Sequence, residues 1–410
     1  MALELARPVA ERFIHFVNKT GSPYHSVKAV KDILITAGFS ELDERGSWKV
    51  TQGGKYFVTR NDSCIAAFVV GAAFGYSGTG GFCITATHTD SPCLRLRPRA
   101  FAEKEGYHMG GVECYGGGLW HTWFDRGLGM AGKVALRVGN KVEERLLHIS
   151  KPLFYLPNLA IHLKTAEEIG AFTINKEQHL QPVLCSAIAE QLSQGNEGKE
   201  QDNKDEAQRL PPALERLVTE AIGVPKAKLL DWDFCLMDST PSRLSGIHSE
   251  FIESPRLDNL ASTFAAFEAL IETSRRHCES IKDDIIMAVA FDHEEVGLIY
   301  LHAAAWLICW LLQGVVIKEN ANQSYASNAC SMSFVRVIAE DAGIPLQDFV
   351  VRNDSRCGGT VGAMLSARLG VRTVDIGIPQ WAMHSCREIC GVTDLMHLQK
   401  LIEVSRPLVT

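Results

Sequence analysis

Three apolar runs in this chain each end beside ionisable residues, and this pattern constrains the fold more than any other feature. GFCITATHTD ends at His88 and Asp90, DDIIMAVAFDHEE ends at Glu294 and Glu295, and LGVRTVDIGIP stops just before QWAMHS, which contains His384. Helical patterns separate or follow these runs, at Leu260 to Arg275, around Ala326 to Ala342, and from Leu395 to Val404. Strands that alternate with helices predict an α/β fold, in which helices flank a mainly parallel sheet. Because sites in such sheets collect at the carboxyl ends of the strands, we expect the three ionisable clusters to lie together.

The texture of the sequence changes between residues 93 and 245, where short alternating runs such as KVALRV and KVEERLLHI are separated by glycine-rich pieces. We therefore expect a mostly β second domain at 93–245, inserted into a catalytic domain formed by 1–92 and 246–410. A chain of 410 residues is long enough for two domains. Gln191 to Arg209 is polar and low in complexity, which is typical of a mobile surface loop.

Leu298 to Leu312 is an almost unbroken apolar segment that directly follows the acidic cluster. It is shorter than the roughly 20 residues that a transmembrane helix needs. It also contains His302 and has no basic flank before Lys318. We therefore predict a buried helix here, and no membrane partner.

Charge and cysteine usage exclude other classes of protein. The formal net charge is −7 at pH 7, so we expect no basic surface for a nucleic acid. The 12 cysteines are scattered without a CxxC pair, which indicates a reducing compartment rather than a disulfide scaffold. The charged N-terminal segment predicts an amphipathic helix that ends near Gly21, not a secretory signal. We therefore expect a cytoplasmic protein.

The adjacent glutamates Glu294 and Glu295 have two interpretations. They form either a solvated strand end or a metal ligand beside a general base. The second interpretation needs imidazole and carboxylate partners, which are ligands that zinc prefers. The candidate metal ligands are His88, Asp258, Glu295 and His384. An HExxH zinc motif is excluded, because the residue four positions after His293 is a glycine.

Two of these candidates also have ordinary structural explanations. Asp258 directly precedes a predicted helix, where aspartate is a common N-cap. His88 ends an apolar run and could be a core histidine with its hydrogen bonds satisfied. Asp90 lies two residues after His88, so this segment could supply both a ligand and the carboxylate that orients it.

Motifs along the chain resemble, in order, those of the aspartyl aminopeptidases, which belong to the di-zinc aminopeptidases with an inserted second domain. The motifs are THTDSP, SPRLDNLAS, FDHEEVG, YASNA, VRNDSRCGGTVG and PQWAMHS. The resemblance extends from about residue 7 to residue 407, apart from 191–209 and 298–312. It implies a zinc aminopeptidase-like α/β fold, removal of N-terminal Asp or Glu from peptides, and two zinc ions per subunit. It also implies a large homo-oligomer, a dodecamer, in which the inserted domain serves assembly and substrate gating.

The same resemblance implies a role for each matching residue. His88 and His384 are similar to terminal ligands, one on each zinc, and Asp258 resembles the bridging carboxylate. Glu295 resembles a ligand of the zinc that His384 holds. Glu294 resembles the general base, which takes a proton from the attacking water.

Further residues match by this comparison alone. Asp90 resembles the carboxylate that orients a histidine ligand. Lys318 would meet the acidic side chain of the substrate, and Tyr325 would stabilise the oxyanion. His162 resembles a residue that the family lends to a neighbouring subunit's site. Without the family, Lys318 is an ordinary surface cation and His162 a core residue.

The chain departs from the family pattern after HEEVG. The family carries a further zinc-binding aspartate in an Asp-Met-Ala-His-Ala segment followed by His-Pro, and neither Asp-Met-Ala nor His-Pro occurs in this sequence. The apolar block 298–313 stands in its place. One zinc position therefore keeps only His88 and a share of Asp258. Gly127 is a lesser departure, because the family usually has an acidic residue there.

Three functions stay open from the sequence. The first is an aminopeptidase for N-terminal Asp or Glu. The second is a catalytically impaired homologue that acts as an assembly subunit. The third is a related metallohydrolase of different specificity.

Overall fold

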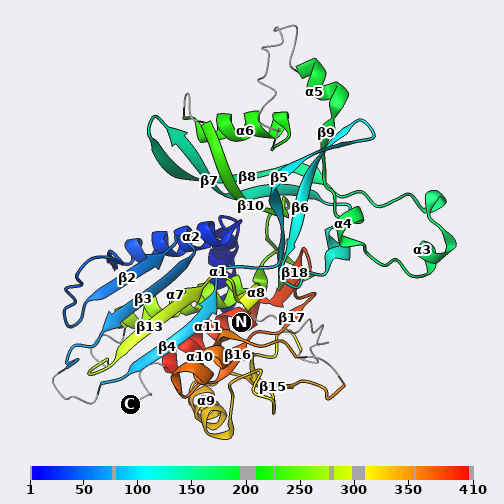
Figure 1. Cartoon of the computed structure of the whole chain (residues 1–410). Coiled ribbons are helices and arrows are strands. Elements are labelled where there is room, and N and C mark those ends of the chain that lie inside the picture. Colours follow the sequence, from blue (N-terminus) through cyan, green and yellow to red (C-terminus); the bar gives the residue numbers. More distant parts are fainter. Residues whose placement is uncertain are drawn as a thin grey trace. The chain divides into compact units, whose positions relative to one another are not determined.

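The structure is a computed structural model that describes residues 2–75, 80–193, 209–224, 228–276, 281–297, 310–354 and 357–405. It divides into two compact units, Met1–Ser91 with Ser242–Thr410, and Pro92–Pro241 (Figure 1). The first unit combines helices with mixed β-sheets, and the second is built on a β-barrel.

The first unit contains all three ionisable clusters. Its helices are α1 (Ala2–Val17), α2 (Pro23–Thr36), α7 (Leu257–Arg276), α8 (Glu294–Gly297), α9 (Ala329–Asp341), α10 (Val361–Leu369) and α11 (Val392–Ser405). Its strands are β1 (Ser40–Glu41), β2 (Lys55–Arg60), β3 (Cys64–Val70), β4 (Phe82–His88), β11 (Arg243–Ser245), β12 (Phe251–Ser254), β13 (Ile285–Phe291), β14 (Val315–Glu319), β15 (Leu346–Val350), β16 (Asp375–Gly377), β17 (Gln380–Trp381) and β18 (Glu388–Gly391). Four of the predicted helices are confirmed, as α1, α7, α9 and α11.

The largest sheet of this unit has the order β1-β2-β3-β13-β4. Its β4 and β13 strands are parallel, as are β1 and β2, but β3 is antiparallel to both β2 and β13. The prediction of a mainly parallel sheet is therefore wrong, and the sheet is mixed. The cause is local: Asn61 and Asp62 have positive φ values of 54° and 55°, so β2 and β3 form a tight antiparallel hairpin.

Two smaller sheets have the orders β15-β14-β16 and β11-β12-β18-β17. The third apolar run, LGVRTVDIGIP, is strand only at Asp375–Gly377, which corrects the longer strand expected there. Its first residue, Leu369, ends α10, and Gly370 closes that helix with a φ of 66°. Glycine adopts this left-handed conformation without steric cost, so the chain turns before the strand can begin.

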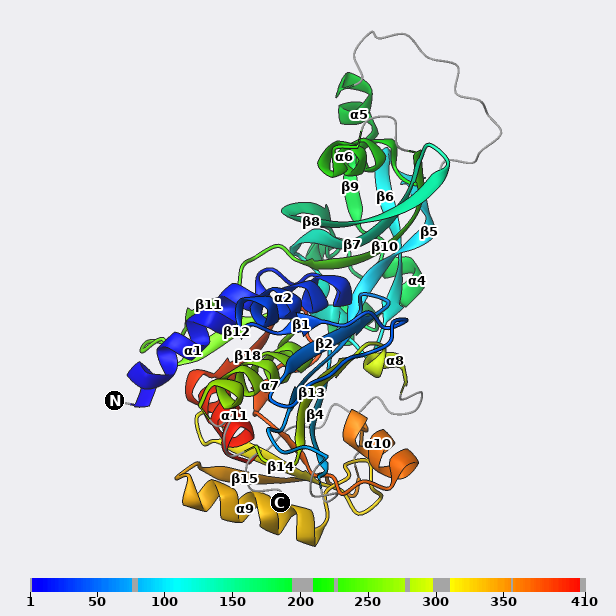
Figure 2. The same ribbon diagram turned by 90° about the vertical axis from the view of Figure 1, so that its left-hand side faces the viewer.

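Helix α7 forms the centre of the core of this unit. It packs against β4 and β13, and α11 packs against α7 (Figure 2). Phe264 of α7 is 2% exposed, and its ring centroid lies 5.5 Å from those of both Phe13 and Phe16 in α1. These apolar contacts fix the start of α7, which carries Asp258.

The second unit contains a closed barrel with the order β10-β5-β6-β9-β8-β7. Its strands are β5 (Cys93–Lys104), β6 (Tyr107–Tyr115), β7 (Gly127–Val138), β8 (Lys141–Tyr155), β9 (Val183–Ser186) and β10 (Lys228–Asp238). Its helices are η1 (Trp120–Trp123), η2 (Ile161–Leu163), α3 (Ala166–Gly170), α4 (Lys176–His179), α5 (Ala187–Ser193) and α6 (Pro212–Ile222). Gly127 begins β7 where a Cβ atom would lie 2.7 Å from Cβ of Pro152, so this position has no room for the side chain expected from the family.

Two predictions fall largely outside the described residues. These are the surface loop at 191–209, of which 194–208 is not described, and the buried helix at 298–312, of which 298–309 is not described. Among the helices that the structure does describe, none has the length and apolar character needed to span a bilayer.

Candidate metal centre

Strands β4 and β13 bring two ionisable clusters to one edge of the large sheet. The two strands are parallel neighbours, and His88, the last residue of β4, pairs with the last residue of β13. Glu294 and Glu295 follow β13 as the first residues of α8. Asp258 lies in the first turn of α7, with non-helical φ and ψ values of −82° and 108°. His384 lies between β17 and β18, with a φ of 66°.

The carboxylate of Asp258 lies between two imidazoles. Its Oδ1 atom is 3.4 Å from Nε2 of His88, and its Oδ2 atom is 3.1 Å from Nε2 of His384. Oε1 of Glu295 is 3.5 Å from Nε2 of His384, and Oε2 of Glu294 is 3.7 Å from Nε2 of His88. Each imidazole therefore faces Asp258 and one of the two glutamates.

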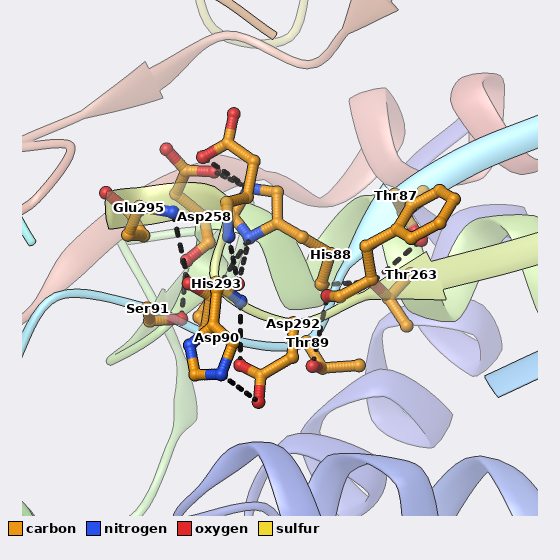
Figure 3. Close-up of polar contacts among 12 residues, drawn as sticks. Thr87, His88, Thr89, Asp90, Ser91, Asp258, Thr263, Asp292, His293 and Glu295 are labelled. Atoms are coloured by element: carbon orange, nitrogen blue, oxygen red, sulfur yellow. Dashed lines mark hydrogen bonds and ion pairs between the residues drawn. The ribbon is translucent and has the colours of Figure 1, made fainter. Parts of the chain in front are cut away.

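Asp90 supports this cluster from behind and is 1% exposed. Nδ1 of His88 donates a hydrogen bond of 3.0 Å to the backbone carbonyl of Asp90 and lies 3.4 Å from its Oδ1 (Figure 3). The two carboxylate oxygens of Asp90 also accept hydrogen bonds from the backbone N–H groups of Glu294 and Glu295, at 3.2 and 3.1 Å. Asp90 thus directs Nε2 of His88 toward Asp258 and fixes the start of α8.

Hydroxyl groups hold the backbone of the same residues. Ser91 donates from Oγ to the carbonyl of Asp258 at 2.6 Å, and Thr263 donates from Oγ1 to the carbonyl of His88 at 2.7 Å. These contacts fix the backbone at the end of β4 and in the non-helical first turn of α7.

Glu388 is a member of the site that the sequence reasoning missed. It is 2% exposed and accepts hydrogen bonds from the backbone N–H groups of Leu257, Asp258 and His384. Burial, together with the charge of Asp258, raises the pKa of Glu388 to about 8, although the hydrogen bond from the backbone N–H of His384 acts in the other direction. The available signal was a glutamate followed by the apolar run Ile389 to Val392, which places a carboxylate in a buried strand.

Burial and neighbouring charges shift the pKa values of the ionisable groups in this cluster. Burial would raise the pKa of Asp258, but hydrogen bonds from His384 and His88 hold it well below its usual range. Burial would lower the pKa of His384, but Asp258 and Glu295 raise it to about 10. Burial raises the pKa of Glu295 to about 8. Asp258 and the two imidazoles therefore stabilise one another's charged forms.

The donor set fits a divalent cation. Two groups of side chains have ligand atoms within 4.8 Å of one another: Asp258, Glu295 and His384, and His88, Glu294 and Glu295. Oε1 of Glu295 is buried and makes no hydrogen bond within the described part of the chain. A buried carboxylate oxygen that accepts no hydrogen bond is a suitable metal ligand, and mixed imidazole and carboxylate ligand sets are typical of zinc.

The remaining candidates lie in different places. Nζ of Lys318, on β14, is 5.6 Å from the ring centroid of Tyr325, which is 8% exposed. Burial raises the pKa of Glu294, and the positive charges of His88 and Lys318 oppose that rise. His162 belongs to η2 in the second unit, where it is exposed.

The model of one protein family, the aminopeptidase I zinc metalloproteases (M18), matches residues 16–300 and 308–404. The chain belongs to the M18 aminopeptidases. It is 34% identical to a relative named aspartyl aminopeptidase from Dictyostelium discoideum, over 98% of this chain and 96% of the relative.

Solved structures agree with the M18 fold. The cryo-EM structure of the Ape4 and Nbr1 complex contains a chain with 34% identity and a TM-score of 0.90, which covers 99% of this chain and 86% of that one. The structure of the S. cerevisiae mApe1 dodecamer has 22% identity and a TM-score of 0.78, over 96% of this chain and 95% of that one. This second likeness concerns the fold alone. The M18 match is interrupted between residues 300 and 308, inside the apolar block that follows the acidic cluster.

Proposed function

We propose that this M18 site removes N-terminal Asp or Glu from peptides, with His88, Asp258, Glu295 and His384 as its zinc ligands. The observation that carries the proposal is the position of Asp258, whose two oxygens face two imidazoles at 3.4 and 3.1 Å. A carboxylate placed in this way suits a bridge between two metal ions. The name of the relative, aspartyl aminopeptidase, supports an acidic first residue of the substrate.

The chain's own residues supply the other roles. Zinc at the site would polarise the scissile carbonyl and make a water molecule more acidic. Glu294 takes a proton from the attacking water and passes it to the leaving amine. Burial raises the pKa of Glu294, which helps its carboxylate to hold the proton between these transfers. Tyr325 donates a hydrogen bond to the developing oxyanion, and Lys318 binds the acidic side chain of the substrate.

We further propose that this chain has one complete zinc position. Asp258, Glu295 and His384 give that position three protein ligands, which is the usual number for a catalytic zinc. The other position keeps His88 and a share of Asp258, because the further aspartate of the family is missing from the sequence. We therefore expect one tightly held zinc and low turnover.

A second candidate function is an impaired subunit that assembles with other copies or with active relatives. The interruption of the family match, where the missing aspartate is expected, favours it. The dodecamer formed by mApe1 supports a homo-oligomer, and the exposed position of His162 suits a residue lent to a neighbouring subunit. We propose that this assembly is located in the cytoplasm.

A panel of peptides that differ only in their first residue tests the proposal. Purified protein is incubated with Asp-, Glu- and Ala-initiated peptides, with and without added zinc. We expect slow, zinc-dependent release of Asp and Glu and much less release of Ala. Faster release of Ala would favour a metallohydrolase of other specificity, and no release by zinc-loaded protein would favour the impaired subunit.

A further inference from the structure

One carboxylate, that of Glu388, connects the backbones of two proposed zinc ligands. Its Oε2 atom accepts hydrogen bonds from the N–H groups of Leu257 at 2.6 Å and Asp258 at 3.3 Å. Its Oε1 atom accepts a hydrogen bond from the N–H group of His384 at 2.7 Å. Asp258 and His384 are 126 positions apart in the sequence. Glu388 therefore joins two distant segments through main-chain contacts.

Both segments need support of this kind. Asp258 has non-helical dihedral angles within the first turn of α7. His384 has a φ of 66°, which non-glycine residues seldom adopt. Such a left-handed conformation persists only when surrounding contacts determine it. The hydrogen bonds to Glu388 are contacts of that kind on both segments.

The position of Glu388 is itself fixed by a strand pair. Glu388 is the first residue of β18 and pairs with Ser254, the last residue of β12. Asp258 follows the end of β12 by four positions, and His384 precedes the start of β18 by four positions. The β12–β18 pair is thus a rigid base from which both ligand segments extend.

We propose that Glu388 is a positioning residue for the metal centre, which sets the separation of Asp258 and His384. Oδ2 of Asp258 and Nε2 of His384 are 3.1 Å apart, close enough to share one metal ion. Without both carboxylate oxygens, the two backbones lose their common acceptor and the ligand atoms separate. This inference rests on the proposed ligand roles of Asp258 and His384.

The test is the affinity for zinc of the full chain carrying E388Q, measured by competition with a chromophoric chelator. The amide has one acceptor oxygen, and its NH₂ group would face a backbone N–H. We expect zinc affinity to fall about 10- to 100-fold, the usual effect of removing a group that supports metal ligands. The matched control is E253Q, because Glu253 lies on β12 beside the same site but contacts Arg243 and Arg387 instead of the ligand backbone.

The unfolding temperature of each metal-free variant separates positioning from a general loss of stability. Zinc affinity is compared at a temperature where the variants are folded, and the absorption spectrum of the Co²⁺-loaded protein reports ligand geometry. E388Q with the affinity and Co²⁺ spectrum of E253Q would overturn the positioning role. If E388Q does not fold, E388D takes its place, because it keeps both oxygens but withdraws them by one methylene. Unchanged zinc affinity in E388D would then overturn the role.

H384A distinguishes failure of this inference from failure of the proposed ligand set. If H384A holds zinc as tightly as the parent, the ligand set is wrong. If H384A loses zinc while E388Q retains it, the ligand set stands and the positioning role alone is wrong.

Discussion

Glu294 and Glu295 are adjacent in the sequence, yet their carboxylates face different imidazoles. Oε2 of Glu294 lies 3.7 Å from His88, and Oε1 of Glu295 lies 3.5 Å from His384. Asp90 accepts hydrogen bonds from the backbone N–H groups of both glutamates, so the start of α8 is fixed relative to His88. This geometry allows one glutamate to hold a metal while its neighbour handles a proton.

The E294Q substitution separates these two roles. An amide cannot accept the proton of the attacking water, so we expect the activity of the parent to fall by about 10²–10⁴. Zinc content should remain that of the parent, because Glu294 is proposed as a base and not as a ligand. Peptide hydrolysis and metal analysis of the same preparation measure both quantities.

The control for E294Q is E340Q, which changes an exposed glutamate on α9. It should leave both activity and zinc content unchanged. Loss of zinc in E294Q would contradict the base role and make Glu294 a ligand beside His88.

Lys318 provides a test of substrate specificity. K318A removes a cation proposed to face the substrate's carboxylate, so kcat/KM should fall much more for Asp-peptides than for Ala-peptides. K400A, which changes an exposed lysine on α11, should affect neither substrate. Equal losses on both substrates in K318A would show that Lys318 does not determine specificity.

Sequence reasoning identified the candidate metal ligands, whose side chains face one another, but it did not identify Glu388, which holds the backbones of two of them. His88, Asp258, Glu295 and His384 carry imidazole and carboxylate groups, and the structure places them together. Glu388 interacts with backbone N–H groups, whose positions depend on φ and ψ and leave little trace in residue types.

At the scale of elements, side-chain contacts fix the backbone of the last residues of the apolar block, from Trp310 onward. The backbone N–H and carbonyl of Trp310 both bond to the side chain of Gln347, at 2.9 Å each. Asp394, in the first turn of α11, accepts hydrogen bonds from the backbone N–H groups of Leu312 at 2.7 Å and Gly314 at 2.9 Å. These contacts define the path into β14, which carries Lys318.

Substitution of Asp394 tests this anchor. The side chain of Asp394 is 0% exposed. D394A removes the acceptor of two backbone N–H groups at this buried position, so we expect the free energy of unfolding to fall by about 2–4 kcal/mol. Urea unfolding measures the loss. D341A, at the exposed end of α9, is the control and should change stability little. Equal midpoints for the two variants would show that Asp394 does not anchor this segment.

Periodicity predicted the helices better than the sheets. The spacing of apolar residues was sufficient for α1, α7, α9 and α11, because an amphipathic helix is a local pattern. Strand direction depends on which strands pair, and the hairpin at Asn61 and Asp62 reversed β3 within a sheet expected to be mainly parallel. The length of β16 was overestimated, because Gly370 ends helix α10 inside the same apolar run.

At the scale of the whole molecule, the M18 family pattern is retained along nearly the full chain and interrupted at one place. The match stops at residue 300 and resumes at 308, close to the acidic cluster on α8. Six motifs in the order of the family were sufficient to predict the family. They also led to the prediction that a zinc-binding aspartate of the family is missing, and the proposed zinc content depends on that prediction.

The most direct test of the account is metal analysis of dialysed protein together with hydrolysis of an Asp-initiated peptide. We predict close to one zinc per subunit, held by Asp258, Glu295 and His384, and turnover far below that of relatives with the complete ligand set. Two tightly held zinc ions with robust cleavage would contradict the account, because another residue would then replace the missing aspartate.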